Sequence, residues 1–146
     1  MRYSIGAKAS AVGSTSRAFI SVWGAAGSGC AVREIGVTNS SSVAFDVVVK
    51  RLTARGAGVG TSLTLSPQNP NGAAAACAAF HTATADHTVG VDLGYRASLG
   101  GSVGAGVVFT FGGDGLVIAA GTANGIGLLL ENGTAQACQV YIVTDE

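Results

Sequence analysis

The sequence predicts an all-β protein, a single-domain β-sandwich or jelly roll of about 8–10 short strands. Short runs in which apolar and polar residues alternate recur along the whole chain, and clusters of Gly, Asn and Ser separate them. No stretch carries a sustained helical pattern. The chain has 146 residues, and no linker or shift in composition divides it, so we expect residues 1–146 to form one domain.

Each alternating run predicts one strand. In the clearest run, residues 43–53, bulky residues such as Phe45 and Val47 alternate with polar ones such as Asp46 and Lys50. Because successive side chains of a strand point to opposite faces, we expect the bulky set to face the core. The predicted strands lie within residues 3–8, 18–23, 34–38, 43–53, 63–65, 89–93, 107–111, 116–120, 126–131 and 136–144.

Turn residues separate the last four of these runs. Gly112 to Gly115, Asn124-Gly125 and Asn132-Gly133 lie between them. Asn-Gly favours tight hairpins, because both residues tolerate positive φ. We therefore expect residues 105–144 to form four successive strands that pair with their neighbours. A jelly roll, in which some of these turns cross between sheets, remains the alternative.

The stretch 66–88 is the longest predicted connection. It contains both prolines and both histidines, and residues 73–80 within it are rich in alanine. A helix of one or two turns and a packed loop are both compatible with that alanine-rich segment. Because long loops in small β domains often face a partner, we expect this stretch to lie near an interface.

The charge is unusually low. Asp, Glu, Lys and Arg make up 11% of the residues and the net formal charge is zero, against about 25% charged residues in an average domain. A neutral chain argues against a nucleic-acid binder, which would carry a basic excess. No apolar run approaches the ~20 residues of a membrane span, and we expect no membrane association. Low charge favours a surface that other subunits cover, or one coated in Ser, Thr and Gly.

Three cysteines, Cys30, Cys77 and Cys138, show no motif spacing. We expect buried free thiols in a protein made in a reducing host cytoplasm, with one disulfide plus a spare thiol as the alternative. The two histidines form an H-x5-H pattern. On a strand these positions would lie ~20 Å apart, and a metal site needs a third ligand. No Gly-x-Ser-x-Gly elbow occurs, so we expect no enzyme activity, no metal and no cofactor.

Several residues are candidates for subunit contacts. The basic cluster of Lys50, Arg51 and Arg55 lies where a strand is predicted to end. It fits either a solvated strand end or a contact with an acidic neighbour, such as a shell subunit or the Asp145-Glu146 end of another copy. Trp23 could anchor an interface or pack in the core. The remaining candidates are His81, His87 and Leu129, the last because alternation within residues 128–130 turns it away from the core.

The chain also resembles a family of small virion proteins of tailed bacteriophages. Five segments carry the resemblance, and together they span residue 33 to the C-terminal region. They are Arg33-Glu-Ile-Gly-Val-Thr-Asn39, Lys50-Arg-Leu-Thr53, Gly104-Ala-Gly-Val-Val-Phe-Thr-Phe111, Gly115-Leu-Val-Ile118 and Gly121-Thr-Ala-Asn-Gly-Ile-Gly127.

The resemblance implies a head decoration, or cement, protein. Such a protein binds the major capsid protein on the outer surface of the virion, often as a homotrimer, and brings no catalytic residues. A tail or receptor-binding β module of the virion is the first alternative. A cupin-like small-ligand binder or enzyme, which would require a metal, is the second.

Overall fold

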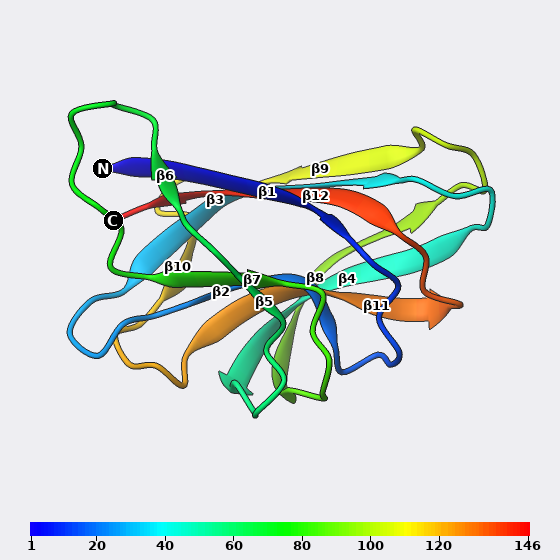
Figure 1. Ribbon diagram of the computed structural model, residues 1–146, viewed down its shortest axis with the longest axis horizontal. Coiled ribbons are helices and arrows are strands. Elements are labelled where there is room, and N and C mark those ends of the chain that lie inside the picture. Colours follow the sequence, from blue (N-terminus) through cyan, green and yellow to red (C-terminus); the bar gives the residue numbers. More distant parts are fainter.

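The computed structural model describes all 146 residues and forms two antiparallel sheets packed face to face (Figure 1). The β-sandwich predicted from the sequence is therefore confirmed. Sheet A has the order β10-β3-β12-β1-β6, with β9 also paired to β3, and sheet B has the order β5-β7-β2-β11-β4-β8. The strands are β1 (Arg2–Ala9), β2 (Ala18–Trp23), β3 (Cys30–Asn39), β4 (Phe45–Ala54), β5 (Thr61–Leu63), β6 (Ser66–Pro67), β7 (Ala78–His81), β8 (Thr88–Leu99), β9 (Gly106–Thr110), β10 (Leu116–Ile118), β11 (Gly125–Gly133) and β12 (Cys138–Asp145).

The strand pairing is that of a jelly roll. Strands from the first half of the chain pair with strands from the second half in reverse order: β1 with β12, β2 with β11, β3 with β9 and β10, and β4 with β8. This is the pattern of one long hairpin rolled into two sheets. Each step along these principal strands, from β1 to β4 and from β8 through β9–β10 to β12, crosses from one sheet to the other.

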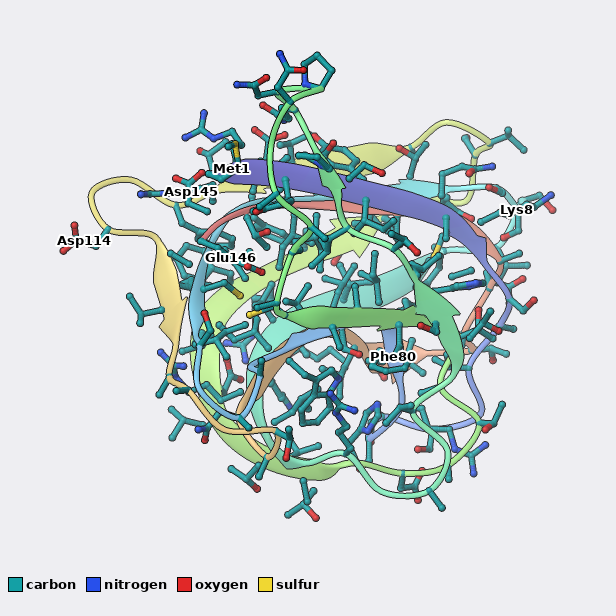
Figure 2. All side chains as sticks on the ribbon, turned by 60° about the vertical axis from the view of Figure 1, so that its left-hand side comes forward. Met1, Lys8, Phe80, Asp114, Asp145 and Glu146 are labelled. Atoms are coloured by element: carbon teal, nitrogen blue, oxygen red, sulfur yellow. The ribbon has the colours of Figure 1, made fainter.

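The expected neighbour pairing within 105–144 is therefore wrong. β9 and β10 do not pair with each other but follow one another along the same side of β3. The 111–115 segment between them is a loop, in which Gly113 and Gly115 adopt φ of 60° and 73°. Figure 2 shows Asp114 at the tip of this projecting loop. Asn124 ends the turn between β10 and β11, which lie in different sheets. The turn predicted at Asn132-Gly133 is wrong, because both residues belong to β11 and pair with β4.

The stretch 66–88 is also not one long connection. It contains β6, which pairs with β1, and β7, which lies between β5 and β2 in sheet B. The alanine-rich residues 73–80 form no helix, and the last of them belong to β7. These two short strands, which the sequence did not predict, bring the count to twelve, against the 8–10 expected.

The main core fills the space between the sheets. It is a single cluster of 27 buried residues contributed by both layers. Phe19 of β2 and Phe45 of β4 pack there with ring centroids 5.6 Å apart. As expected from alternation, Phe45 and Val47 face this core.

A second hydrophobic cluster lies on the outer face of sheet B. It consists of five buried residues, which are Ala18, Trp23, Val48, Leu52 and Leu129. Leu129 pairs with Val48 on one side and with Ala18 on the other, so the three form a row across β4, β11 and β2. The 55–60 and 82–87 loops run beside this face and hydrogen-bond to each other and to β2. Residues 18–23 and 125–130 are consequently buried without alternation.

This second cluster corrects two expectations about subunit contacts. Leu129 does point away from the main core, as alternation predicts, but its side chain is 0% exposed. Trp23 is also 0% exposed, which agrees with core packing and leaves no surface for a partner. The sequence could not show that loops of the same chain close over this face.

The burial of Leu129 predicts a large loss of stability on truncation. Leu129→Ala should lower the free energy of unfolding by about 3 kcal/mol, because it removes buried methyl groups and leaves a cavity. Urea denaturation followed by circular dichroism measures this change. Ser62→Ala, at an exposed position of β5, is the control and should change stability by less than about 0.5 kcal/mol. Equal effects of the two substitutions would contradict the assigned burial.

Candidate interaction surface

The basic cluster predicted from the sequence is dispersed in the structure. Lys50 pairs in register with Asp92 of the neighbouring strand β8. The guanidinium of Arg51 donates a hydrogen bond from Nη1 to the carbonyl oxygen of Val117 at 2.7 Å. This bond links β4 of sheet B to β10 of sheet A at one end of the sandwich. Lys50 and Arg51 therefore serve different neighbours and do not form one basic patch.

Arg55 lies over aromatic rings of its own chain. Its guanidinium carbon is 5.8 Å from the ring centroid of Trp23 and 5.1 Å from that of Phe80. His87 packs on the same Trp23 with ring centroids 5.5 Å apart, and its Nδ1 lies 2.8 Å from the backbone oxygen of Arg55. These contacts cover the outer cluster of sheet B, and cation–π contacts of this kind contribute about 0.5–2 kcal/mol each.

The two histidines occupy separate environments. His81 Nδ1 lies 3.0 Å from the hydroxyl of Thr82, which also accepts a hydrogen bond from the backbone N–H of Ser10. His87 is buried, and its Nε2 has no hydrogen-bond partner. No group of three or more His, Cys, Asp and Glu side chains has the geometry to hold a metal ion. An interface role for either histidine stays a prediction.

The acidic C-terminal residues bind within the chain. The Asp145 carboxylate accepts hydrogen bonds from Arg2 at 3.0 Å and from Arg33 at 2.6 Å. The Glu146 carboxylate accepts two backbone N–H groups of the same chain. Figure 2 shows Met1, Asp145 and Glu146 together at one end of the molecule. Both carboxylates thus have partners within the chain, and a contact with basic residues of another copy stays a prediction.

Two shallow hollows mark the surface. The first has a volume of about 360 Å³, lies beside Arg51 and Asn124, and is lined by no carboxylate, histidine or cysteine. The second has a similar volume and lies over Ser4, Gly6 and Tyr141 on the outer face of sheet A. Neither hollow brings together groups that the sequence singled out for chemistry. None of the elements is a helix with the length and apolar character of a membrane span.

The exposed apolar side chains gather on one flank of the sandwich. This flank, here called the β8–β10 flank, comprises β8, β9, β10 and the 40–44 and 100–105 loops. Of the seven large apolar side chains exposed in the chain, every one except Met1 lies on it. The six are Val43, Val91, Tyr95, Val103, Val108 and Val117. A concentration of apolar side chains at one edge is typical of an interaction surface.

Internal contacts hold this flank rigid. Tyr95 of β8 packs edge-on against Phe111 with ring centroids 4.7 Å apart, which joins the edge of sheet B to sheet A. Buried Asn39 donates hydrogen bonds from Nδ2 to the carbonyl oxygens of Val43 at 2.8 Å and Gly100 at 2.9 Å. It thereby fixes the two loops of the flank to each other.

The outer edge of β8 is protected against strand addition. The Asp92 carboxylate accepts a hydrogen bond from the N–H of Gly94 at 2.7 Å and also binds Arg96, while Gly94 adopts a φ of 81°. Pairing with β4 shifts register three times along this strand. Bulges and charges of this kind block edge-to-edge pairing. A partner on this flank would therefore contact side chains, since a continuous ladder cannot form.

The outer face of sheet A, unlike that of sheet B, is open and flat. The Tyr141 ring lies against Gly36 of the neighbouring strand, where a Cβ atom would come within 2.0 Å of the ring. Its hydroxyl donates a hydrogen bond to Glu34 at 2.6 Å, and this bond, with a smaller contribution from burial, raises the pKa of Tyr141 to about 12. Val108 continues the same row on β9, so this face adjoins the β8–β10 flank.

Comparison of the chain with protein-family models, with curated proteins and with solved structures finds no match.

The Asp145 ion pairs predict a pH-dependent contribution to stability. Hydrogen bonds from Arg2, and then from Arg33, hold the pKa of Asp145 below its ordinary value of about 3.9. The stabilisation is therefore present above about pH 4 and is lost as the pH falls through the lowered pKa. Asp145→Asn should lower Tm by roughly 3–6 °C at pH 7, and this difference should shrink between about pH 4 and pH 2.

Differential scanning calorimetry across this pH range checks the expectation. The control is Asp114→Asn in the exposed 111–115 loop, since Asp114 forms no ion pair. It should follow the wild type at every pH. A difference for Asp145→Asn that stays constant down to about pH 2 would show that the charge contributes nothing.

Proposed function

We propose that this chain is a structural virion protein that decorates and stabilises the outer surface of a tailed-phage capsid. It would bind the major capsid protein there, and it would act as an oligomer. The observation that carries the proposal is the gathering of six of the seven large exposed apolar side chains on the β8–β10 flank. Exposed apolar side chains that concentrate at one edge favour a protein that works by lateral contact.

Two further features support this proposal. The chain carries 11% charged residues and no net charge, so closely spaced copies on a shell would not repel each other. The resemblance of the segments between residues 33 and 127 to small phage virion proteins points to the same setting and implies three copies per oligomer. The jelly roll fits both, because it is a rigid framework that presents loops and edges at fixed positions.

We propose that the β8–β10 flank is the contact between copies of the chain. Tyr95 and Val103 would form its apolar centre, and Arg96 with Glu131 its polar rim, since these two already bond at 2.8 Å. The guarded edge of β8 directs the contact to side chains. The open face of sheet A, with its flat Tyr141 and its Ser and Thr residues, would then remain available to the capsid protein.

Charged substitutions on the flank should dissociate the oligomer. Val91→Asp with Val103→Asp places two carboxylates where the proposal buries apolar surface. The two positions are the most exposed of the large apolar residues, so the fold and its circular dichroism spectrum should not change. Light scattering on a sizing column should then report the mass of one chain, while the wild type elutes as an oligomer.

The matched control carries Ser62→Asp and Gln68→Asp. These exposed residues lie at β5 and just after β6, at the opposite edges of the two sheets. This variant should keep the wild-type mass. A wild type that is monomeric at all concentrations, or a flank variant with unchanged mass, would overturn the proposed contact.

The place in the virion is tested by quantitative mass spectrometry of purified source particles. Copies of this chain comparable in number to the major capsid protein would support a shell-covering role. A number lower by about two orders of magnitude would assign the chain to the tail or to a single vertex. Absence from the particles would reject the virion function.

A further inference from the structure

Two of the three buried cysteines meet between the sheets. Cys30 begins β3 in sheet A, and Cys77 immediately precedes β7 in sheet B. Both belong to the main core, and each is 6% exposed. Ala31, the residue after Cys30, pairs with Asp145, and the carboxylate of the next residue, Glu146, accepts the backbone N–H of Cys77, so the C-terminal residues bring the two cysteines close together. Their neighbours in sequence, Gly-Cys-Ala and Ala-Cys-Ala, gave no sign of this juxtaposition.

The backbone around the two thiols is fixed from both sides. Ala78, the residue after Cys77, pairs with Trp23 at the end of β2. From Trp23 the chain passes through the short 24–29 loop directly into Cys30, which pairs with Ile118 of β10. Trp23 is therefore connected to both cysteines. It pairs with the residue that follows Cys77, and the 24–29 loop joins it to Cys30.

The C-terminal residue holds the segment that carries Cys77. The Glu146 carboxylate accepts hydrogen bonds from the N–H groups of Ala76 at 2.8 Å and Cys77 at 2.9 Å. In addition, the backbone N–H of Glu146 donates to the carbonyl of Met1 at 2.9 Å. Both ends of the chain thus meet beside the two cysteines, and these hydrogen bonds fix the segment that carries Cys77.

The two thiols differ in acidity. The hydrogen bond from the Cys30 thiol lowers the pKa of Cys77, and the backbone of Ala25 acts in the same direction against burial and the Glu146 carboxylate. The same thiol–thiol hydrogen bond, followed by burial, raises the pKa of Cys30. Cys77 is therefore the sulfur that ionises first and attacks first.

We propose that Cys30 and Cys77 form an intrachain disulfide by exchange with a low-molecular-weight disulfide of the glutathione class. The Cys77 thiolate attacks one sulfur of the small disulfide, breaks its S–S bond and releases one small thiolate. Cys30 then loses its proton to solvent, and its sulfur attacks the Cys77 sulfur and releases the second small thiolate. Two protein thiols and one small disulfide give one protein disulfide and two small thiols.

The product would join sheet A to sheet B covalently and lock the segment between residues 30 and 77. Constraining the unfolded chain in this way should raise Tm by roughly 10 °C. In the setting of the proposed function, and resting on it, the chain would fold reduced in the host cytoplasm. It would become cross-linked once the particle reaches an oxidising medium.

The test uses the purified full chain and does not depend on any virion role. The chain is reduced, desalted and incubated with oxidised glutathione, and its free thiols are then alkylated. Trypsin cleavage separates the three cysteines, which fall in peptides 18–33, 56–96 and 97–146. We expect peptide 18–33 joined to peptide 56–96, an alkylated Cys138, and a Tm that rises by roughly 10 °C and falls back on reduction.

Matched variants make the result specific. Cys138→Ala should still form the cross-link, because Cys138 lies apart from the pair and burial raises its pKa to about 12. Cys30→Ala and Cys77→Ala should each abolish both the cross-link and the rise in Tm. Recovery of only glutathione adducts, of a bond to Cys138, or of disulfide-linked dimers would overturn the proposal. The flank variant Val91→Asp with Val103→Asp should form the disulfide like the wild type. The proposed contact between copies and the proposed disulfide are therefore tested independently.

Discussion

The fold depends on burying the central strand β11 on both of its faces. One face meets the main core, and the other carries Leu129 into the outer cluster with Trp23 and Val48. An antiparallel strand usually leaves one face to water, so covering this one requires additional chain. The 55–60 and 82–87 loops provide it, with Arg55 and His87 lying over Trp23. The centre of the outer face of sheet B is thereby covered.

Local alternation made the sandwich and most principal strands predictable, because period-two patterns such as Phe45 and Val47 report directly which side of a strand is buried. Pairing could not be predicted in the same way. Asn-Gly at residues 124–125 specifies a turn, but whether the turn joins neighbours or crosses between sheets depends on long-range packing. The same limit applies to the proposed surface. Alternation correctly predicts that Leu129 points away from the main core. Its predicted exposure is wrong, because the loops that cover it lie far away in the sequence.

The candidate contact residues were chosen by residue type and by closeness in the sequence, and neither shows how side chains are arranged in space. Lys50, Arg51 and Arg55 are close together in the chain. Arg51 nevertheless binds a carbonyl of the other sheet, Arg55 lies over two aromatic rings, and Lys50 sits opposite Asp92 in the ladder with β8. Charges close together in sequence thus act separately. The apolar flank could not be predicted, because its exposed apolar residues come singly from strands and loops spread between residues 43 and 117. Residues far apart in sequence thus form one edge. The Cys30–Cys77 pair belongs to the same class, since only the rolled topology brings these two positions together.

The irregular edge of β8 at Asp92 and Gly94 would have its largest effect where many copies are confined to one surface, as in the proposed virion setting. Proteins tethered side by side on a shell experience effective concentrations in the millimolar range. At such concentrations an unguarded twelve-residue edge strand would template pairing with any copy within reach. A bulged edge with an internal Asp–Arg pair permits close packing without polymerisation. Crowding would then tighten the lateral contacts between copies while each subunit kept its own hydrogen-bond network.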